Sequence, residues 1–299
     1  MQRTQLKRSI SLPYITFYGL GTILGAGVYV LIGKVAGASG LYAPFSFALA
    51  ALVACFTAFS YCELSSRYPK SAGESVYIHV AFNKTWLSTI VGLLVILTGI
   101  VSAATIINGF VGYLNYFITV PSSVAIISLV TGLTILAVWG ITESVVFATV
   151  VTLIEIAGLL FVIIVAGDNL GNLSSRWQEL LPEANASDWL GIILGSFLAF
   201  YAFIGFEDIV NIAEEVKNPK KNLPLAILLS FFIAFILYLT IAVIAVLAMP
   251  IDILAKSDAP LASLLMGYNE SYGKIISLIS LIAVVNGALV QVIMSSRVM

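Results

Sequence analysis

The stretch Phe200-Tyr201-Ala202-Phe203-Ile204-Gly205-Phe206-Glu207 interrupts a long apolar segment with small residues and then with a carboxylate. A charged loop, Glu214-Glu215-Val216-Lys217-Asn218-Pro219, follows it. Another apolar segment, near the start of the chain, is interrupted at Gly25-Ala26-Gly27. Interrupted hydrophobic helices at corresponding positions of two halves indicate the substrate site of a transporter.

The composition is that of a membrane protein. The chain has 299 residues, of which 60% are hydrophobic and only 10% are charged, whereas soluble domains carry about 25% charged residues. The charges lie in short gaps between long apolar runs, so we expect an integral protein of the lipid bilayer. A net charge of −1 gives no case for nucleic acid as a partner.

Eight apolar runs are long enough to span a membrane, at about 20 residues each. With the N-terminus inside, ten Lys and Arg residues lie on the inner side and four on the outer side, which is the bias of cytoplasmic loops. The predicted spans are 12–35, 41–64, 86–117, 121–139, 143–167, 188–212, 223–249 and 272–296. The inner loops also predict a short interfacial helix over 74–84 and a helix start with Asn222 as N-cap.

The two interruptions fall in the first and sixth spans, which indicates a repeat of five spans. Because five is an odd number, the second copy of the repeat must enter the membrane from the opposite face. We therefore predict an all-α bundle with inverted five-helix repeats. Its parts are a first repeat over 1–167, an extracellular loop over 168–187 and an incomplete second repeat over 188–299. A complete second repeat would need spans six to ten, so we expect a sequence truncated after the eighth helix. The alternative is a complete eight-span protein.

A broken helix can hold both charged ends of an amino acid. Free N–H groups at the start of the outer half-helix favour the carboxylate, and free carbonyls at the end of the inner half-helix favour the ammonium group. Gly25 and Gly27 let backbone approach a ligand, or else only permit close helix packing. The predicted substrate-binding residues are Ile23, Leu24, Gly25, Ala26, Gly27, Val28, Phe200, Tyr201, Ala202 and Phe203.

Two acidic residues lie at membrane depth. Glu155 falls in the middle of the fifth span, where a charge costs about 2.5–3.5 kcal/mol on insertion scales. It is a candidate to bind the coupling proton or to lie near a cation; the alternative is a permanently protonated acid hydrogen-bonded to a neighbouring helix. Glu207 begins the inner half of the sixth span, as a cap or as a gating residue. Nearer the inner face, we expect Glu63, Glu214 and Glu215 to pair with Arg67 and Lys217.

Four motifs resemble those of the amino acid–polyamine–organocation transporter family. They occur in the same order as in that family, and the resemblance covers essentially the whole chain. The motif of 203–207 and 214–219 is the most specific of them. The other three are Gly21-Thr22-Ile23-Leu24-Gly25-Ala26-Gly27-Val28-Tyr29, Glu63-Leu64-Ser65-Ser66-Arg67-Tyr68-Pro69 with Ala72-Gly73, and Asn286-Gly287-Ala288 with Ser295-Ser296-Arg297.

The resemblance implies the fold of the sodium-coupled leucine transporter, alternating access and a place in the plasma membrane. It implies that Tyr201 is an aromatic gate over the substrate. Some proton-coupled relatives have a lysine where this chain has Glu155, so their mechanism does not transfer directly. No cofactor is implied.

Other classes fit less well. The sequence shows no metal cluster, no Ser–His pair and no nucleophile motif, so an enzyme is not expected. A non-transporting amino-acid sensor and an amino-acid exchanger remain alternatives to a proton-coupled permease. The guessed pocket residues Ala202, Phe203, Phe206 and Asn108 are mostly apolar, which favours a neutral amino acid as substrate.

Overall fold

The computed structural model describes residues 8–25, 27–118, 120–139, 141–257 and 259–298. Within these ranges the chain is helical, and the one strand-like feature is an isolated bridge between Ile10 and Val216. The predicted all-α class is therefore confirmed. The helices are α1 (Leu12–Leu24), α2 (Gly27–Ser39), α3 (Ala43–Arg67), α4 (Gly73–Phe82), α5 (Thr85–Phe117), α6 (Ser122–Trp139), α7 (Ile141–Ala166), α8 (Leu173–Leu180), α9 (Ala186–Phe203), α10 (Pro219–Ala248), α11 (Ile251–Lys256), α12 (Pro260–Met266) and α13 (Glu270–Val298), with 3-10 helices η1 (Gly40–Tyr42), η2 (Gly167–Asn172) and η3 (Phe206–Glu215).

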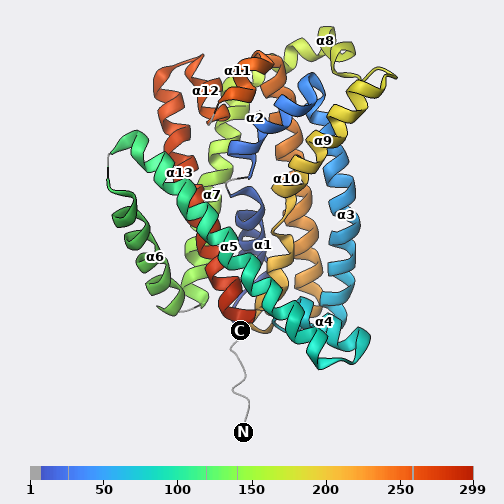
Figure 1. Cartoon of the computed structure of the whole chain (residues 1–299), viewed down its shortest axis with the longest axis vertical. Helices are drawn as coiled ribbons and strands as arrows, with labels where there is room; N and C mark the ends of the chain where they lie inside the picture. Colours follow the sequence, from blue (N-terminus) through green and yellow to red (C-terminus); the bar gives the residue numbers. More distant parts are fainter. Residues whose placement is uncertain (1–7, 26, 119, 140, 258, 299) are drawn as a thin grey trace.

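Six helical runs in the described ranges are long and apolar enough to cross a membrane. The first run, Leu12–Arg67, contains two of the eight expected spans, and α6 is a shorter apolar helix. The chain is thus a multi-span integral membrane protein. Figure 1 shows α4 and the end of α13 at one end of the bundle, with α8, α11 and α12 at the other.

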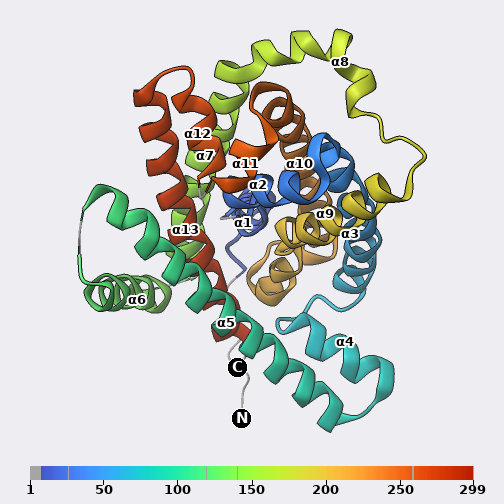
Figure 2. The same ribbon diagram turned by 45° about the horizontal axis from the view of Figure 1, so that its top comes forward.

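Helix α1 lies in the centre of the bundle, as Figures 1 and 2 both show. It contacts α7, α10 and α13. Tyr18, Ile15 and Leu24 on this helix are fully buried. A helix that is apolar on all sides is expected in such a position.

The two interruptions lie next to each other. α1 ends at Leu24 and α2 begins at Gly27, while α9 ends at Phe203 and η3 begins at Phe206. Gly205, in the second gap, has φ +132°, and a Cβ there would lie 2.8 Å from Cγ2 of Thr22 on α1. Only glycine tolerates both that backbone conformation and that approach.

Local details on the side predicted to face the cytoplasm differ in part from expectation. The short helix predicted over 74–84 is α4. However, α10 begins at Pro219 after Asn218, not after Asn222, because proline is well suited to the first turn of a helix and needs no N–H there.

The inner-side ion pairs also differ in part. Arg67 pairs with Glu63 as expected, but the partner of Glu215 is Arg297 at 3.0 Å, not Lys217. The N–H of Lys217 instead donates to the carbonyl oxygen of Ile10. The ion pair between Arg297 and Glu215 places the end of α13 against the end of η3, and these two segments are far apart in the sequence.

We expect Gly205→Ala to destabilise the protein. The glycine-only backbone conformation costs about 1–3 kcal/mol for other residues, and the contact with Thr22 adds to it. The thermal unfolding midpoint of the purified protein in detergent should fall. Gly132→Ala is the matched control, because nothing lies within 4 Å of a Cβ at Gly132. Equal midpoints for the two variants would contradict the close junction of the breaks.

Candidate functional site

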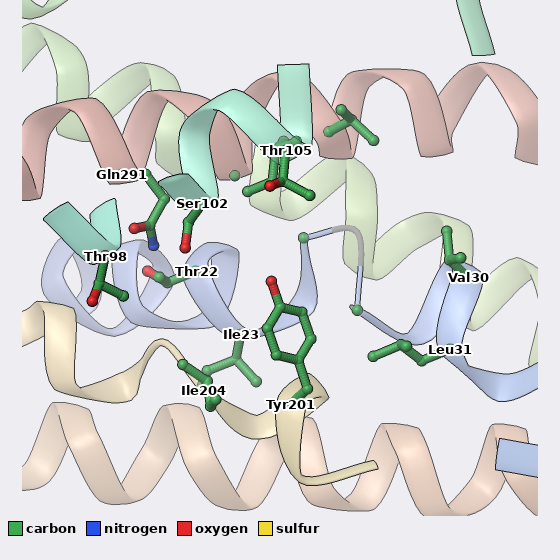
Figure 3. A pocket seen from close by; sticks show the side chains of 15 residues that line it. Thr22, Ile23, Val30, Leu31, Thr98, Ser102, Thr105, Tyr201, Ile204 and Gln291 are labelled. Atoms are coloured by element: carbon green, nitrogen blue, oxygen red, sulfur yellow. The ribbon is translucent and has the colours of Figure 1, made fainter. Parts of the chain in front are cut away.

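A cavity of about 300 Å³ opens at the junction of the two interruptions. Figure 3 shows its lining seen from close by. The cavity is formed by both sides of the α1–α2 break, the end of α9, and one face each of α5 and α13. The lining residues are Thr22, Ile23, Gly25, Gly27, Val30, Leu31, Thr98, Ser102, Thr105, Ile106, Tyr201, Ile204, Val284, Gly287 and Gln291.

The cavity has a polar end and an apolar end. Thr22, Thr98, Ser102 and Gln291 lie together at one end in Figure 3, and Val30 and Leu31 lie at the other. Tyr201 stands between them, with its hydroxyl directed toward the gap between α1 and α2. An elongated molecule with one polar and one apolar part would fit this arrangement.

None of the fifteen described lining residues is charged. The nearest acidic groups lie behind the wall. Gln291 donates from Nε2 to Oδ2 of Asp208 at 2.9 Å, and Asp208 is only 4% exposed. Glu207 turns back to accept the N–H of Gly205 at Oε2, 2.8 Å away, as expected for a cap of the second break.

The sequence-based prediction missed the contribution of α5. Thr98, Ser102 and Thr105 are spaced by four and three residues, so they share one helix face. Thr98 and Thr105 donate their hydroxyls to carbonyls of their own helix, so the hydroxyl oxygens remain acceptors. That spacing of small hydroxyl residues in an apolar helix is a signal that could have identified this wall.

The predicted substrate residues fall into three groups. Ile23, Gly25, Gly27 and Tyr201 line the cavity, and Ala26 lies outside the described residues. The others do not line it: Phe200 is half-buried, while Leu24, Val28, Ala202 and Phe203 are buried in the core. The sequence placed these residues at the break but could not determine which way each side chain points.

The carbonyl of Ile23, predicted to take the ammonium group, already accepts a hydrogen bond. The hydroxyl of Tyr238 on α10 donates to it at 2.6 Å. The guessed pocket residues also lie elsewhere. Phe206 is buried, and Asn108 is exposed and donates to the carbonyl of Ala104 in its own helix. Neither residue lines this cavity, because the direction in which a helix face points depends on the elements packed against it.

Glu155 lies behind the cavity between α7 and α13. It is fully buried, and its Oε1 accepts a hydrogen bond from Asn286 Nδ2 at 3.0 Å. Its Oε2 has no hydrogen-bond partner. The Tyr29 hydroxyl, on α2, donates to its main-chain oxygen at 2.8 Å. Glu155 thus contacts the second half of the broken helix, and no Lys or Arg pairs with it in the part of the chain that the structure describes.

Together the fold and the cavity define a multi-span helical membrane protein with a cavity where two interrupted helices meet. The chain matches the amino acid permease family over residues 10–299. It belongs to that family.

Several relatives are transporters by name. The chain is 32% identical to the mitochondrial cationic amino acid transporter 3 of Arabidopsis thaliana, over 87% of this chain and 45% of that protein. It is 28% identical to the branched-chain amino acid permease BcaP of Bacillus subtilis, over 89% and 60% respectively. The methylthioribose transporter of Bacillus subtilis is also 28% identical, over 82% and 56%. The chain therefore spans about half the length of these curated relatives.

We expect Asn286→Ala to lower the free energy of unfolding by about 1–3 kcal/mol, because the buried Glu155 carboxyl loses its donor. Glu155→Gln should lower the free energy of unfolding by less, since the amide oxygen of the new glutamine still accepts a hydrogen bond from Asn286. Asn108→Ala is a matched control in an exposed position. Denaturant or thermal unfolding in detergent measures the stability of all three variants. An Asn286→Ala variant as stable as the control would refute a stabilising role of the hydrogen bond between Asn286 and Glu155.

Proposed function

We propose that this chain belongs to a secondary transporter that carries neutral amino acids across the membrane by alternating access. The observation that carries the proposal is the uncharged cavity at the junction of the two interrupted helices. Backbone at membrane depth is tolerated outside a helix only where it is buried in protein or lines a cavity. A break of this kind is therefore retained for a ligand.

The break provides complementary ends for an amino acid. α2 begins at Gly27, and the first N–H groups of a helix have no partner within it, so they favour a carboxylate. α1 ends at Leu24, and the last carbonyls of a helix favour an ammonium group. The Tyr238 hydrogen bond fixes the carbonyl of Ile23 and leaves one lone pair of that oxygen.

The side-chain part of the cavity favours an uncharged substrate. A cationic side chain would need a carboxylate to replace its hydration, and the lining offers only hydroxyls, one amide and apolar groups. Relatives named for cationic and for branched-chain amino acids are both similar to this chain. The lining chemistry favours the second class.

The remaining roles follow from this proposal. Tyr201 is an aromatic gate, since its ring lies across the cavity between the two helix ends. Residues 1–167 belong to one of the two inverted repeats and residues 188–299 to the other. The Lys and Arg bias sets the N-terminus in the cytoplasm, and we assign the protein to the plasma membrane.

Uptake of labelled leucine by proteoliposomes containing the full-length protein tests the function. We expect saturable uptake that Ser102→Leu lowers by roughly tenfold or more, because overpacking a filled site costs about 1–3 kcal/mol. Thr89→Leu, at an exposed position of the same helix, should leave uptake unchanged.

The outcomes separate the alternatives. Uptake that requires internal amino acid indicates an exchanger. Binding of leucine by the purified protein without any flux would replace the transporter by a sensor. Uptake of lysine in preference to leucine would refute the neutral substrate class and keep the transporter.

We infer further that Glu155 binds the coupling proton. Its carboxyl is buried, has one donor and no cationic partner among the described residues, and contacts α2 through Tyr29. An inward proton gradient should then stimulate uptake, and a protonophore should abolish the stimulation. Glu155→Gln should remove this pH dependence, whereas Glu143→Gln, at the exposed start of α7, should retain it. A Glu155→Gln variant with the pH profile of the wild type would refute the proton role.

A further inference from the structure

A separate carboxyl group lies on the inner side of the bundle, on the short helix α4. Helix α4 is docked on η3, the segment that follows the second interruption. The N–H of Gly73 donates to Oδ1 of Asn211 at 3.2 Å, and a Cβ at Gly73 would lie 2.3 Å from Val210 Cγ2. Gly73 therefore permits a contact that a side chain would prevent.

Helix α4 is also tied to α5. Ser75 and Ser88 exchange hydrogen bonds, each hydroxyl donating to the main-chain oxygen of the other residue at 3.0 and 2.7 Å. Helix α4 thus bridges α5, which lines the cavity, and η3, which begins directly beside it. A change in the docking of α4 would therefore reach one wall of the cavity, through α5, and the segment that follows the second interruption, through η3.

Glu74, in the first turn of α4, directs its carboxyl group into this contact. Oε1 accepts from the Tyr61 hydroxyl at 3.2 Å, and Oε2 is buried without a hydrogen-bond partner. Asn211 of η3 is fully buried, and its side-chain amide faces the carboxyl group of Glu74. The docking of α4 on η3 therefore places the Glu74 carboxyl group in a buried polar contact.

The surroundings of Glu74 are acidic and aromatic. Tyr61 comes from α3 and Tyr77 from α4 itself, and η3 contributes Glu207 and Asp208. Helix α5 carries no charged residue between Thr85 and Phe117. Within the described residues, Glu74 has no ion pair with Lys or Arg. A buried carboxylate beside other carboxylates and without a cation is costly, whereas a protonated one is not.

We propose that Glu74 is a proton-binding site that holds α4 against η3 while it is protonated and weakens this docking when the proton leaves. The ligand is a proton exchanged with the inner aqueous phase. The site is distinct from the cavity and from Glu155, which lies between α7 and α13 behind the cavity. It senses pH on the inner side and acts on the segment after the second break.

Burial, and after it the neighbouring Glu207 carboxylate, raises the pKa of Glu74 from 4.5 to about 7, although the hydrogen bonds with Tyr61 and Asn211 oppose the shift. An undocked, solvated carboxyl group has its ordinary pKa of about 4.3. The docked state therefore binds the proton more tightly, so acid favours docking. The free energy that favours docking therefore decreases as the pH rises from the pKa of the undocked state to that of the docked state. It is lowest above about pH 7.

Hydrogen exchange of the protein in nanodiscs tests this without any substrate. Peptides covering α4 and η3 should lose protection by at least about tenfold between roughly pH 5 and pH 7.5, after correction for the intrinsic exchange rate. Glu74→Gln, which mimics the protonated form, should keep the protection across that range. Glu214→Gln, at an exposed position of η3, should behave as the wild type.

Two results would overturn the proposal. One is the same pH-dependent loss of protection in Glu74→Gln as in the wild type, and the other is no pH dependence in the wild type. If Glu74→Gln fails to fold, Tyr61→Phe provides an independent test. It removes a donor that stabilises the carboxylate, so the midpoint of the transition should move to higher pH, and an unchanged midpoint would count against the site. Failure here leaves the transport proposal intact, because no transported molecule enters the measurement.

Discussion

The structure depends on one constraint of the bilayer: every backbone polar group in it must have a partner. Helices meet that constraint within themselves, which is why the described residues form a helical bundle. The two interruptions break the rule, and they do so side by side at Gly205 and Thr22. Placing both breaks at one point buries their unsatisfied groups in protein and creates a polar surface that faces a cavity.

Long-range hydrogen bonds of tyrosine fix the two halves of the first broken helix. Tyr238 donates to the carbonyl of Ile23 at the end of α1, and Tyr29 of α2 donates to the main-chain oxygen of Glu155. Each hydroxyl joins residues far apart in the sequence. The broken helix is therefore held by α10 on one side and by α7 on the other.

Acidic groups surround the cavity but do not line it. Asp208 accepts a hydrogen bond from Gln291, Glu207 accepts the N–H of Gly205, Glu155 accepts from Asn286, and Glu74, on α4, accepts from Tyr61. This arrangement leaves the cavity itself uncharged and places protonatable groups where they contact the elements that form its walls. In the proposals made above, recognition of substrate and response to protons therefore belong to different residues.

The sequence alone determined the membrane class, the helical segments and the positions of the two interruptions, because the length and hydropathy of a segment and its glycines act locally. It also singled out Ile23, Gly25, Gly27 and Tyr201, which line the cavity. It did not reveal Thr98, Ser102 and Gln291 as cavity walls, nor that Arg297 is the partner of Glu215. Those facts depend on which face of each helix meets its neighbours, and helices apolar all round carry little periodicity to indicate it. Only the tertiary packing decided them.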